Sequence, residues 1–272
     1  MEIDIAVAQM DVEPAAPAVN LEKAAAFVEK AAAGGAKVIV FPENFLNRHP
    51  RGREDLVDFK GKYREHFRRL ARTYGIDIVA GSVTEGSRLG WFNTTHYIDS
   101  RGEILARYRK INLWLYEAED ITPGNEVVVA DASYGRVGFA ICWDLAFPEL
   151  FRRMAHAGAE VVFCASFWCY EDAGPGLEYD RQAEEKFVDS LCVARAFENE
   201  ICMVYCNAAG TTARDGYTTS IGHSQIAVPF KGALSRLDQQ EELLIQRVDT
   251  SILRVAEQAY QIRRDLAGRI LW

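Results

Sequence analysis

Four short runs of consecutive apolar residues, rich in β-branched side chains, constrain the fold of this chain more than any other feature. They are KVIVF (37–41), IDIVAGSV (76–83), EVVFCASF (160–167) and ICMVYCN (201–207). A strand with one face in water alternates apolar and polar residues, whereas a continuous apolar run is typical of a strand buried on both faces. The sequence therefore predicts an α/β protein in which helices cover the strand layers.

Helical segments are expected between these runs. Residues 21–33 predict a helix with Asn20 as its N-cap, and two glycines follow its end. A second, amphipathic helix is predicted over roughly 53–74, and a third over about 179–198. The apolar stripe of the second helix comprises Leu56, Phe59, Tyr63, Phe67 and Leu70.

The chain contains no internal repeat, low-complexity run or linker, so its 272 residues are predicted to form a single domain. We place this domain at residues 1–258 and treat 259–272 as a C-terminal tail. The tail has little helical or strand periodicity, and it ends in Trp272. A frayed terminus is one interpretation, but its large apolar side chains favour docking on a partner subunit.

Charge and cysteine usage narrow the range of functions. The net charge of −8 and the pI of about 5.3 argue against a nucleic-acid partner. The N-terminus lacks the basic residues of a signal peptide, and no run approaches the roughly 18 apolar residues that span a bilayer. The six cysteines lie mostly in apolar segments and are predicted to be reduced thiols. We therefore expect a cytoplasmic protein without a membrane partner.

Three reactive side chains fall at the ends of predicted strands. KVIVF runs into Pro42 and Glu43, ILARYR runs into Lys110, and RVGFAI runs into Cys142. Reactive groups in open α/β sheets collect just beyond the carboxyl ends of the strands. We therefore expect the carboxylate, the ammonium group and the thiol to lie close together.

Each of these residues also has a structural interpretation. Cys142 shares its strand face with small residues and precedes a turn with free backbone N–H groups, yet a packed core thiol fits its position equally well. Glu43 is either a loop carboxylate or a buried general base, whose pKa burial would raise. Lys110 either belongs to a solvated cationic cluster or stabilises an oxyanion. The five histidines suggest no Cys–His pair, so the glutamate is the leading base for the thiol.

The segments FPENF, RKINLW…E and ICWDLAFPE, in this order, resemble the three catalytic blocks of the nitrilase superfamily of carbon–nitrogen hydrolases. IAVAQMD, LEKAAAFVEKAAAGGAKVIVFPE, TPGN, ASFW, RAFEN and the N-x-x-G of 207–210 also have counterparts, so the resemblance covers nearly the whole chain. It implies a four-layered α-β-β-α sandwich. It also implies a homodimer or higher homo-oligomer, with the tail reaching onto a partner subunit.

The resemblance implies a role for each catalytic residue. Cys142 becomes the nucleophile, Glu43 the general base and Lys110 the oxyanion stabiliser. The family has a second glutamate between the lysine and the Pro-Gly turn, for which Glu117 and Glu119 are candidates. Glu117 lies seven residues after Lys110 and six before Pro123, which matches the spacing of amidase members, so we prefer it.

The substrate-binding residues are predicted less directly. Asn112 replaces the family's usual histidine, so that position loses its titrating group. Trp143 lies where many amidases carry tyrosine, but some nitrile-hydrolysing members also have tryptophan. Phe167 and Trp168, followed by Tyr170, are either an aromatic wall beside the thiol or part of the core. We take Trp143, Phe167 and Trp168 as candidate substrate-binding residues.

The sequence thus predicts hydrolysis of a non-peptide C–N bond in a small amide or N-carbamoyl amine, through a cysteine acyl-thioester, with release of ammonia or amine. Nitrile hydrolysis by the same residues and a non-catalytic binding or regulatory protein are the alternatives. The basic loop 47–53 favours an anionic substrate and the acidic loop 170–180 a cationic one, unless both are solvated rims. No cofactor is expected. Cys202 and Cys206 lack a second ligand pair at zinc spacing, so no metal site is expected either.

Overall fold

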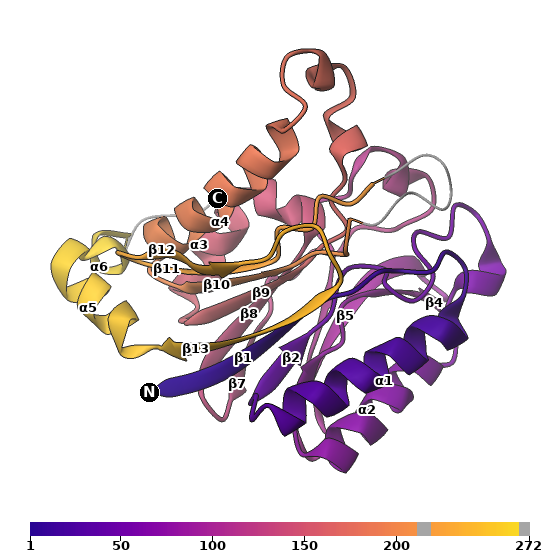
Figure 1. The fold of residues 1–272 in the computed structure, drawn as a ribbon, viewed down its shortest axis with the longest axis horizontal. Coiled ribbons are helices and arrows are strands. Elements are labelled where there is room, and N and C mark those ends of the chain that lie inside the picture. The colour runs from indigo at the N-terminus through magenta and orange to yellow at the C-terminus, as the bar shows by residue number, and fades with distance from the viewer. Residues whose placement is uncertain (211–218, 267–272) are drawn as a thin grey trace.

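The computed structural model describes residues 1–210 and 219–266 and consists of two β-sheets that face each other, each covered by helices on its outer side. Figure 1 shows α1 (Pro17–Ala33) and α2 (Lys62–Tyr74) outside one sheet, and α3 (Pro148–His156) and α4 (Ala183–Asn199) outside the other. This arrangement is the four-layered α-β-β-α sandwich, and it confirms the predicted fold class.

The first sheet has seven strands in the order β13-β1-β2-β3-β5-β4, with β6 paired to β5. Its strands are β1 (Glu2–Gln9), β2 (Val38–Val40), β3 (Asp77–Val79), β4 (Val83–Ser87), β5 (Gly90–Ile98), β6 (Ile104–Arg109) and β13 (Glu242–Asp249). The second sheet has six strands in the order β12-β11-β10-β9-β8-β7. These are β7 (Val129–Ala132), β8 (Gly135–Ile141), β9 (Val161–Ala165), β10 (Cys202–Cys206), β11 (Gln225–Val228) and β12 (Gly232–Arg236).

The central strands of both sheets are parallel: β1, β2 and β3 in the first, and β8, β9 and β10 in the second. Alternate residues of β2 serve two different cores, which explains its continuous apolar run. Val38 and Val40 pack between the two sheets, whereas Ile39 faces the core beneath α1 and α2. Burial on both faces therefore removes every side chain of this strand from water.

The first helix begins earlier than predicted. α1 starts at Pro17, because proline is tolerated in the first turn of a helix, where its missing N–H is not needed. Asn20 is therefore not an N-cap. Its side chain accepts a hydrogen bond from Glu13 N at 3.0 Å and donates to Leu46 O at 2.9 Å, so it joins the loop before the helix to the loop after β2.

The second helix is shorter than the predicted segment 53–74. Residues Glu54–Leu56 form a separate 3₁₀ turn, and α2 begins only at Lys62. The preceding Gly61 has φ 68°, and the carboxylate of Asp58 accepts hydrogen bonds from Lys62 N and Tyr63 N, both at 3.1 Å. These contacts satisfy backbone donors at the new helix start, where no partner exists within the helix.

The C-terminal segment differs from the irregular tail that the sequence indicates. α5 spans Ser251–Tyr260 and α6 spans Ile262–Leu266. The Arg263 guanidinium donates to Ala159 O at 2.8 Å and to Glu200 O at 2.9 Å, which holds α6 against the ends of α3 and α4. Residues 267–272, including Trp272, lie outside the described residues. Docking of the tail on a partner subunit stays a prediction.

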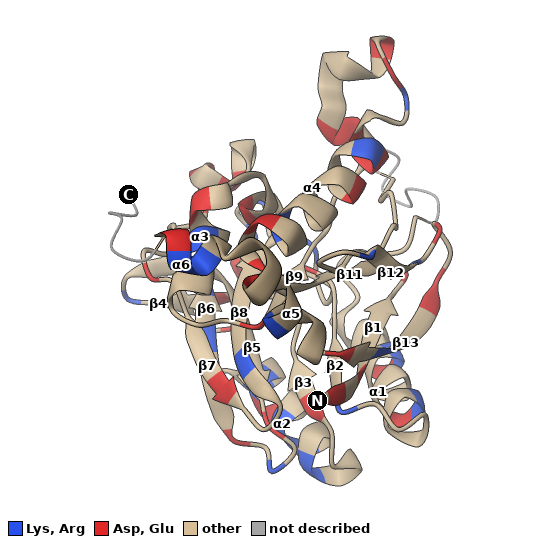
Figure 2. Ribbon diagram, turned by 90° about the vertical axis from the view of Figure 1, so that its left-hand side faces the viewer, with Lys and Arg blue, Asp and Glu red and all other residues tan. Residues whose placement is uncertain are grey.

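Basic and acidic residues are interspersed along the ribbon, as on α4 and α6 in Figure 2. Across residues 1–210 and 219–266, none of the helices is long and apolar enough to cross a membrane.

Candidate active site

The fold brings the predicted catalytic residues together around one cavity of about 330 Å³. Glu43 follows β2, Lys110 follows β6 and Cys142 follows β8, so all three lie at the carboxyl ends of strands. Glu117 enters from the short 3₁₀ turn Leu115–Glu119. The side chains are almost excluded from solvent, with exposed fractions of 4% for Glu43, 1% for Lys110, 4% for Glu117 and 8% for Cys142.

Lys110 lies between two carboxylates. Its Nζ donates to Glu43 Oε1 at 2.8 Å and to Glu117 Oε2 at 2.6 Å. Asn93 Nδ2, from β5, donates to Glu43 Oε1 at 2.8 Å and to Glu117 Oε1 at 3.3 Å. Buried charges are stable only when they are paired and hydrogen-bonded, and this cluster provides both kinds of contact.

Burial and neighbouring charges shift the pKa values of Glu43, Lys110 and Cys142. Burial raises the pKa of Glu43 above its ordinary value, although Lys110 opposes the rise. Burial alone would lower the pKa of Lys110, but the neighbouring carboxylates outweigh it and hold that pKa well above its ordinary value. Burial, reinforced by Glu43, also raises the pKa of Cys142 well above its ordinary value. The thiol is therefore protonated at neutral pH and needs a base before it can attack.

The turn after β2 aims Glu43 at this cluster. Glu43 N donates to Ser166 O at 3.1 Å, and Phe167 N donates to Glu43 Oε2 at 3.2 Å. Gly81, in the segment after β3, adopts φ 54° and allows that segment to pack closely against this turn, since a Cβ there would lie only 2.2 Å from Pro42 O. Sheet geometry and backbone contacts thus fix the carboxylate in place.

Cys142 lies in a tight turn that begins the 3₁₀ segment Cys142–Ala146. Its φ of 46° is in the left-handed region, which costs a non-glycine residue about 1 kcal/mol or more. Asp144 stabilises the turn, since its fully buried carboxylate accepts hydrogen bonds from Ile141 N at 2.9 Å and from Tyr108 Oη at 2.6 Å. It also accepts from Asn112 N and Nδ2, both at 2.9 Å. A turn of this shape exposes a nucleophile to substrate.

Asp144→Asn is expected to lower kcat about 100-fold. The amide of asparagine would point its own N–H groups at some of the donors whose hydrogen bonds Asp144 now accepts, and the disturbed turn would displace the Cys142 thiol. Tyr108→Phe, which removes one donor only, should cost much less. The rate of Cys142 alkylation as a function of pH checks this, since a displaced thiol has a different profile. An unchanged profile with normal turnover would show that Asp144 does not position Cys142.

The three candidate substrate-binding residues, Trp143, Phe167 and Trp168, all line the cavity. The Trp143 ring lies 5.5 Å from that of Trp168, between ring centroids. Tyr170 is not among the described residues that line it. Of the two candidate glutamates, Glu117 contacts Lys110, whereas Glu119 borders a neighbouring pocket with His49 and Asp120.

The structure also identifies residues that sequence reasoning missed. Asn93 is a buried amide in the middle of a strand, where asparagine is disfavoured, and this was the available signal. Asp144 lies two residues after Cys142, within the same 3₁₀ segment. Asp172 reaches the cavity from the acidic loop, while His49 and Arg51 reach it from the basic loop. Both charged loops therefore border the same cavity.

Comparisons with known proteins agree with this fold. The sequence model of the carbon–nitrogen hydrolase family matches residues 4–258. The chain is 28% identical over 253 residues to 2-oxoglutaramate amidase of Bacillus subtilis (strain 168), covering 92% of each chain.

Solved structures extend the likeness. Nit3 of Saccharomyces cerevisiae, a member of branch 10 of the nitrilase superfamily, has a TM-score of 0.82 at 24% identity, covering 95% of this chain and 94% of that one. A variant of the amidase from Nesterenkonia sp. AN1, with acrylamide added at its active-site cysteine, has a TM-score of 0.77 at 25% identity over 97% and 99% of the two chains. This chain therefore belongs to the carbon–nitrogen hydrolase family of the nitrilase superfamily and is an amidase-type hydrolase.

Proposed function

We propose that this enzyme hydrolyses a small linear amide or an N-carbamoyl amine through an acyl-thioester on Cys142. One observation carries the proposal. A buried cluster of Glu43, Lys110 and Glu117 borders the cavity that also contains the Cys142 thiol. The Cys142 thiol and the Glu43 carboxylate line the same cavity, so Glu43 is placed to act as the base that the thiol requires.

In the first half of the reaction, Glu43 accepts the thiol proton and Cys142 Sγ attacks the carbonyl carbon. Lys110 has three N–H donors and, among the described residues, uses two of them on carboxylates, so the third is available to the oxyanion, together with the N–H of Trp143. Protonated Glu43 then gives its proton to the departing nitrogen, and ammonia or amine leaves.

In the second half, Glu43 takes a proton from water as the water oxygen attacks the thioester carbon. The C–S bond breaks, the acid leaves, and Glu43 returns the proton to the sulfur. Glu117 holds Lys110 through its Oε2, which also accepts a hydrogen bond from Trp114 N at 2.7 Å. We assign Glu117 to orienting Lys110 and the substrate nitrogen.

Ammonia release from a panel of compounds tests the proposal. The panel contains small amides, N-carbamoyl amines, nitriles and 2-oxoglutaramate, which the Bacillus subtilis relative is named for. We expect ammonia or amine from at least one amide or carbamoyl amine. Release from a nitrile but not from its matched amide would instead establish nitrile hydrolysis, and release from none would refute the proposal.

We also propose that the protein is cytoplasmic, since its six cysteines are all free thiols, as a reducing compartment requires.

We further propose a homo-oligomer. Phe197, Phe230 and Tyr260 are exposed by 45%, 50% and 44%, and the Tyr260 ring contacts both phenylalanines. Such a cluster is typical of an interface. Light scattering should give a mass at least twice that of the 30.5 kDa chain, and a mass of one chain would contradict this.

A further inference from the structure

Asp172 is a carboxylate that lines the active-site cavity. It lies in the 3₁₀ segment Tyr170–Glu178 and lines the same cavity as Cys142. Its Oδ2 accepts a hydrogen bond from Cys169 N at 2.8 Å. Within the part of the chain that the structure describes, it makes no ion pair with lysine, arginine or histidine. This carboxylate is therefore placed to bind a group that the protein does not supply.

The surroundings of Asp172 are rich in negative charge. Burial raises the pKa of Asp172 to about 7, the Cys169 N–H opposes the rise, and the carboxylates of Glu184 and Glu43 add to it. Lys110 does not offset this excess because two other carboxylates already share it. A cation that entered here would meet an electrostatic environment that favours it over a neutral or anionic group.

Aromatic rings line the same cavity. Trp114, Tyr116, Trp143 and Trp168 are among its walls, and the centroids of Trp114 and Trp143 lie 4.3 Å apart. The faces of such rings attract ammonium groups, and the attraction strengthens where water is excluded. The cavity thus combines the Asp172 carboxylate with several π-faces, and both kinds of group favour a cationic ligand.

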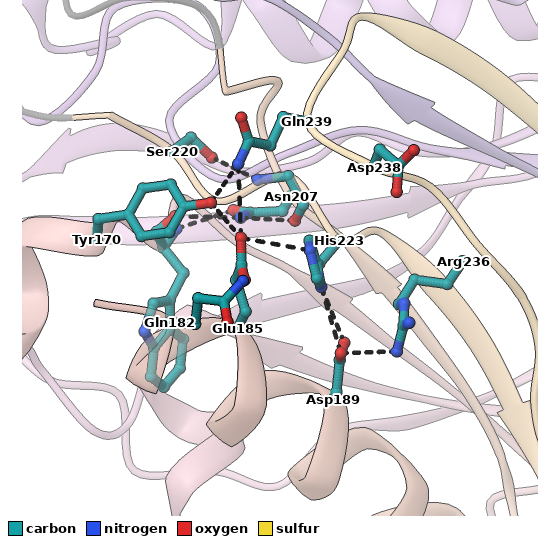
Figure 3. A network of polar contacts seen from close by, with 12 residues as sticks. Tyr170, Gln182, Glu185, Asp189, Asn207, Ser220, His223, Arg236, Asp238 and Gln239 are labelled. Carbon is teal, nitrogen blue, oxygen red and sulfur yellow. Dashed lines mark hydrogen bonds and ion pairs between the residues drawn. The ribbon is translucent and has the colours of Figure 1, made fainter. Parts of the chain in front are cut away.

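The loop that carries Asp172 is fixed rather than loosely attached. In Figure 3, the Tyr170 hydroxyl contacts Glu185 of α4 and Gln239, and Glu185 lies beside His223. Glu171 also accepts a hydrogen bond from Thr219 N at 2.7 Å. These contacts tie both residues before Asp172 to the body of the protein, so the carboxylate is held in position before a ligand arrives.

Two of the three arginines of the basic loop, Arg51 and Arg53, are exposed and therefore less suited to bind the substrate. Arg53 is 57% exposed and pairs with Asp55 at 2.8 Å. Arg51 is exposed and stacks over the Tyr116 ring at 5.2 Å, and Arg48 stacks over the Phe167 ring at 4.8 Å. Exposed charges are screened by water and contribute little to binding. The half-buried Arg48 also lines the cavity, so a cation is favoured at the end of the cavity that Asp172 borders, where the neighbouring charges are carboxylates.

We propose that Asp172 determines specificity by binding an ammonium group at the end of the substrate remote from the scissile amide. The preferred substrate is then a linear amide or N-carbamoyl amine with a terminal amine, such as an ω-amino amide. This inference rests on the proposed hydrolysis, because it assigns the far end of a substrate whose amide reacts at Cys142.

The test measures binding instead of turnover, so that it is independent of the chemistry. Calorimetry on the Cys142→Ala protein compares three series of increasing length: ω-amino amides, alkyl amides with a methyl group in place of the ammonium, and monoamides of dicarboxylic acids. We expect the best ω-amino amide to bind about tenfold or more tightly than its alkyl match. Adding Asp172→Asn should abolish that advantage while the alkyl amide binds as before, which also shows that the variant is folded.

Arg51→Gln is the matched control on the opposite rim, and it should leave the advantage of the ω-amino amide intact. Tightest binding of a dicarboxylic monoamide, with weakening by Arg51→Gln, would overturn the proposal in favour of an anion site. If Asp172→Asn weakened the binding of all three series equally, Asp172 would have only a structural role, and the proposal would be overturned as well. Ammonia release by the unmodified enzyme tests the hydrolysis separately, so the two failures remain distinguishable.

Discussion

The Cys142→Ala variant should lose ammonia release by about 10⁴-fold or more, because the acyl-thioester cannot form without the sulfur. Losses of this size are typical when the nucleophile of a covalent mechanism is removed. The fold should persist, since alanine is smaller than cysteine and Asp144 still holds the turn through Ile141 N. Turnover on the best substrate of the ammonia screen is the measurement, with circular dichroism to confirm folding.

Cys192→Ala is the matched control for this prediction. Cys192 is a fully buried thiol on α4 and is not among the described residues that line the cavity, so its loss should leave turnover nearly unchanged.

Alkylation gives a second readout. Cys142 is 8% exposed and the other five thiols 3% or less, so iodoacetamide should modify Cys142 first, and a substrate analogue should protect it. Full activity of Cys142→Ala would refute the covalent mechanism.

The sequence predicted the position of Cys142 and its partners because those positions depend on strand ends. Glu43 and Cys142 each follow a recognisable apolar run, and Lys110 follows the strand ILARYR. Glu43 and Lys110 follow strands of the first sheet and Cys142 follows a strand of the second, and the two facing sheets bring these carboxyl ends to one cavity. The continuous apolar run of β2 predicted burial on both faces, and the structure confirms it. Features that follow from local pattern and strand geometry were thus predictable.

Features that depend on contacts between distant segments could not be predicted from the sequence. Asn93 interacts with Glu43 across a separation of 50 residues, and Tyr108 with Asp144 across 36, and no local pattern marks either pair. The start of α2 depends on the Asp58 carboxylate, which accepts N–H groups of the first turn from outside the helix. The sequence showed an acidic and a basic loop, but only the structure brings both to one cavity, with Asp172 among the residues that line it.

Lys110→Met should lower both activity and stability, because one buried ammonium serves two carboxylates. The variant loses the charge that stabilises the oxyanion, which typically costs about 10²- to 10³-fold in rate. It also leaves Glu43 and Glu117 buried without their cation, and breaking such a pair costs about 3–5 kcal/mol. Turnover and urea unfolding measure the two effects. Lys186→Met, at a lysine whose side chain is 64% exposed, should change neither by much.

The loss of stability should depend on pH in a defined direction. Without Lys110, the pKa of Glu43 in the folded protein rises further above its unfolded value, so folding takes up a proton. When the pKa of an acid is higher in the folded than in the unfolded protein, the acid destabilises the fold least at pH values below its unfolded pKa. It destabilises the fold most at pH values above its folded pKa. The deficit of Lys110→Met should therefore grow as pH rises through that range, and a constant deficit would contradict the pairing.

A double variant separates the two roles of Lys110. Adding Glu117→Gln to Lys110→Met removes one of the two carboxylates that the lysine had paired, and the amide still accepts from Trp114 N. Part of the lost stability should return, because fewer uncompensated charges are buried. Turnover should not return, since neither substitution restores a cation at the oxyanion. Recovery of both stability and turnover would mean that Lys110 acts only by pairing the carboxylates. If the turnover of Lys110→Met alone were within tenfold of that of the unmodified enzyme, Lys110 would be excluded as the oxyanion stabiliser.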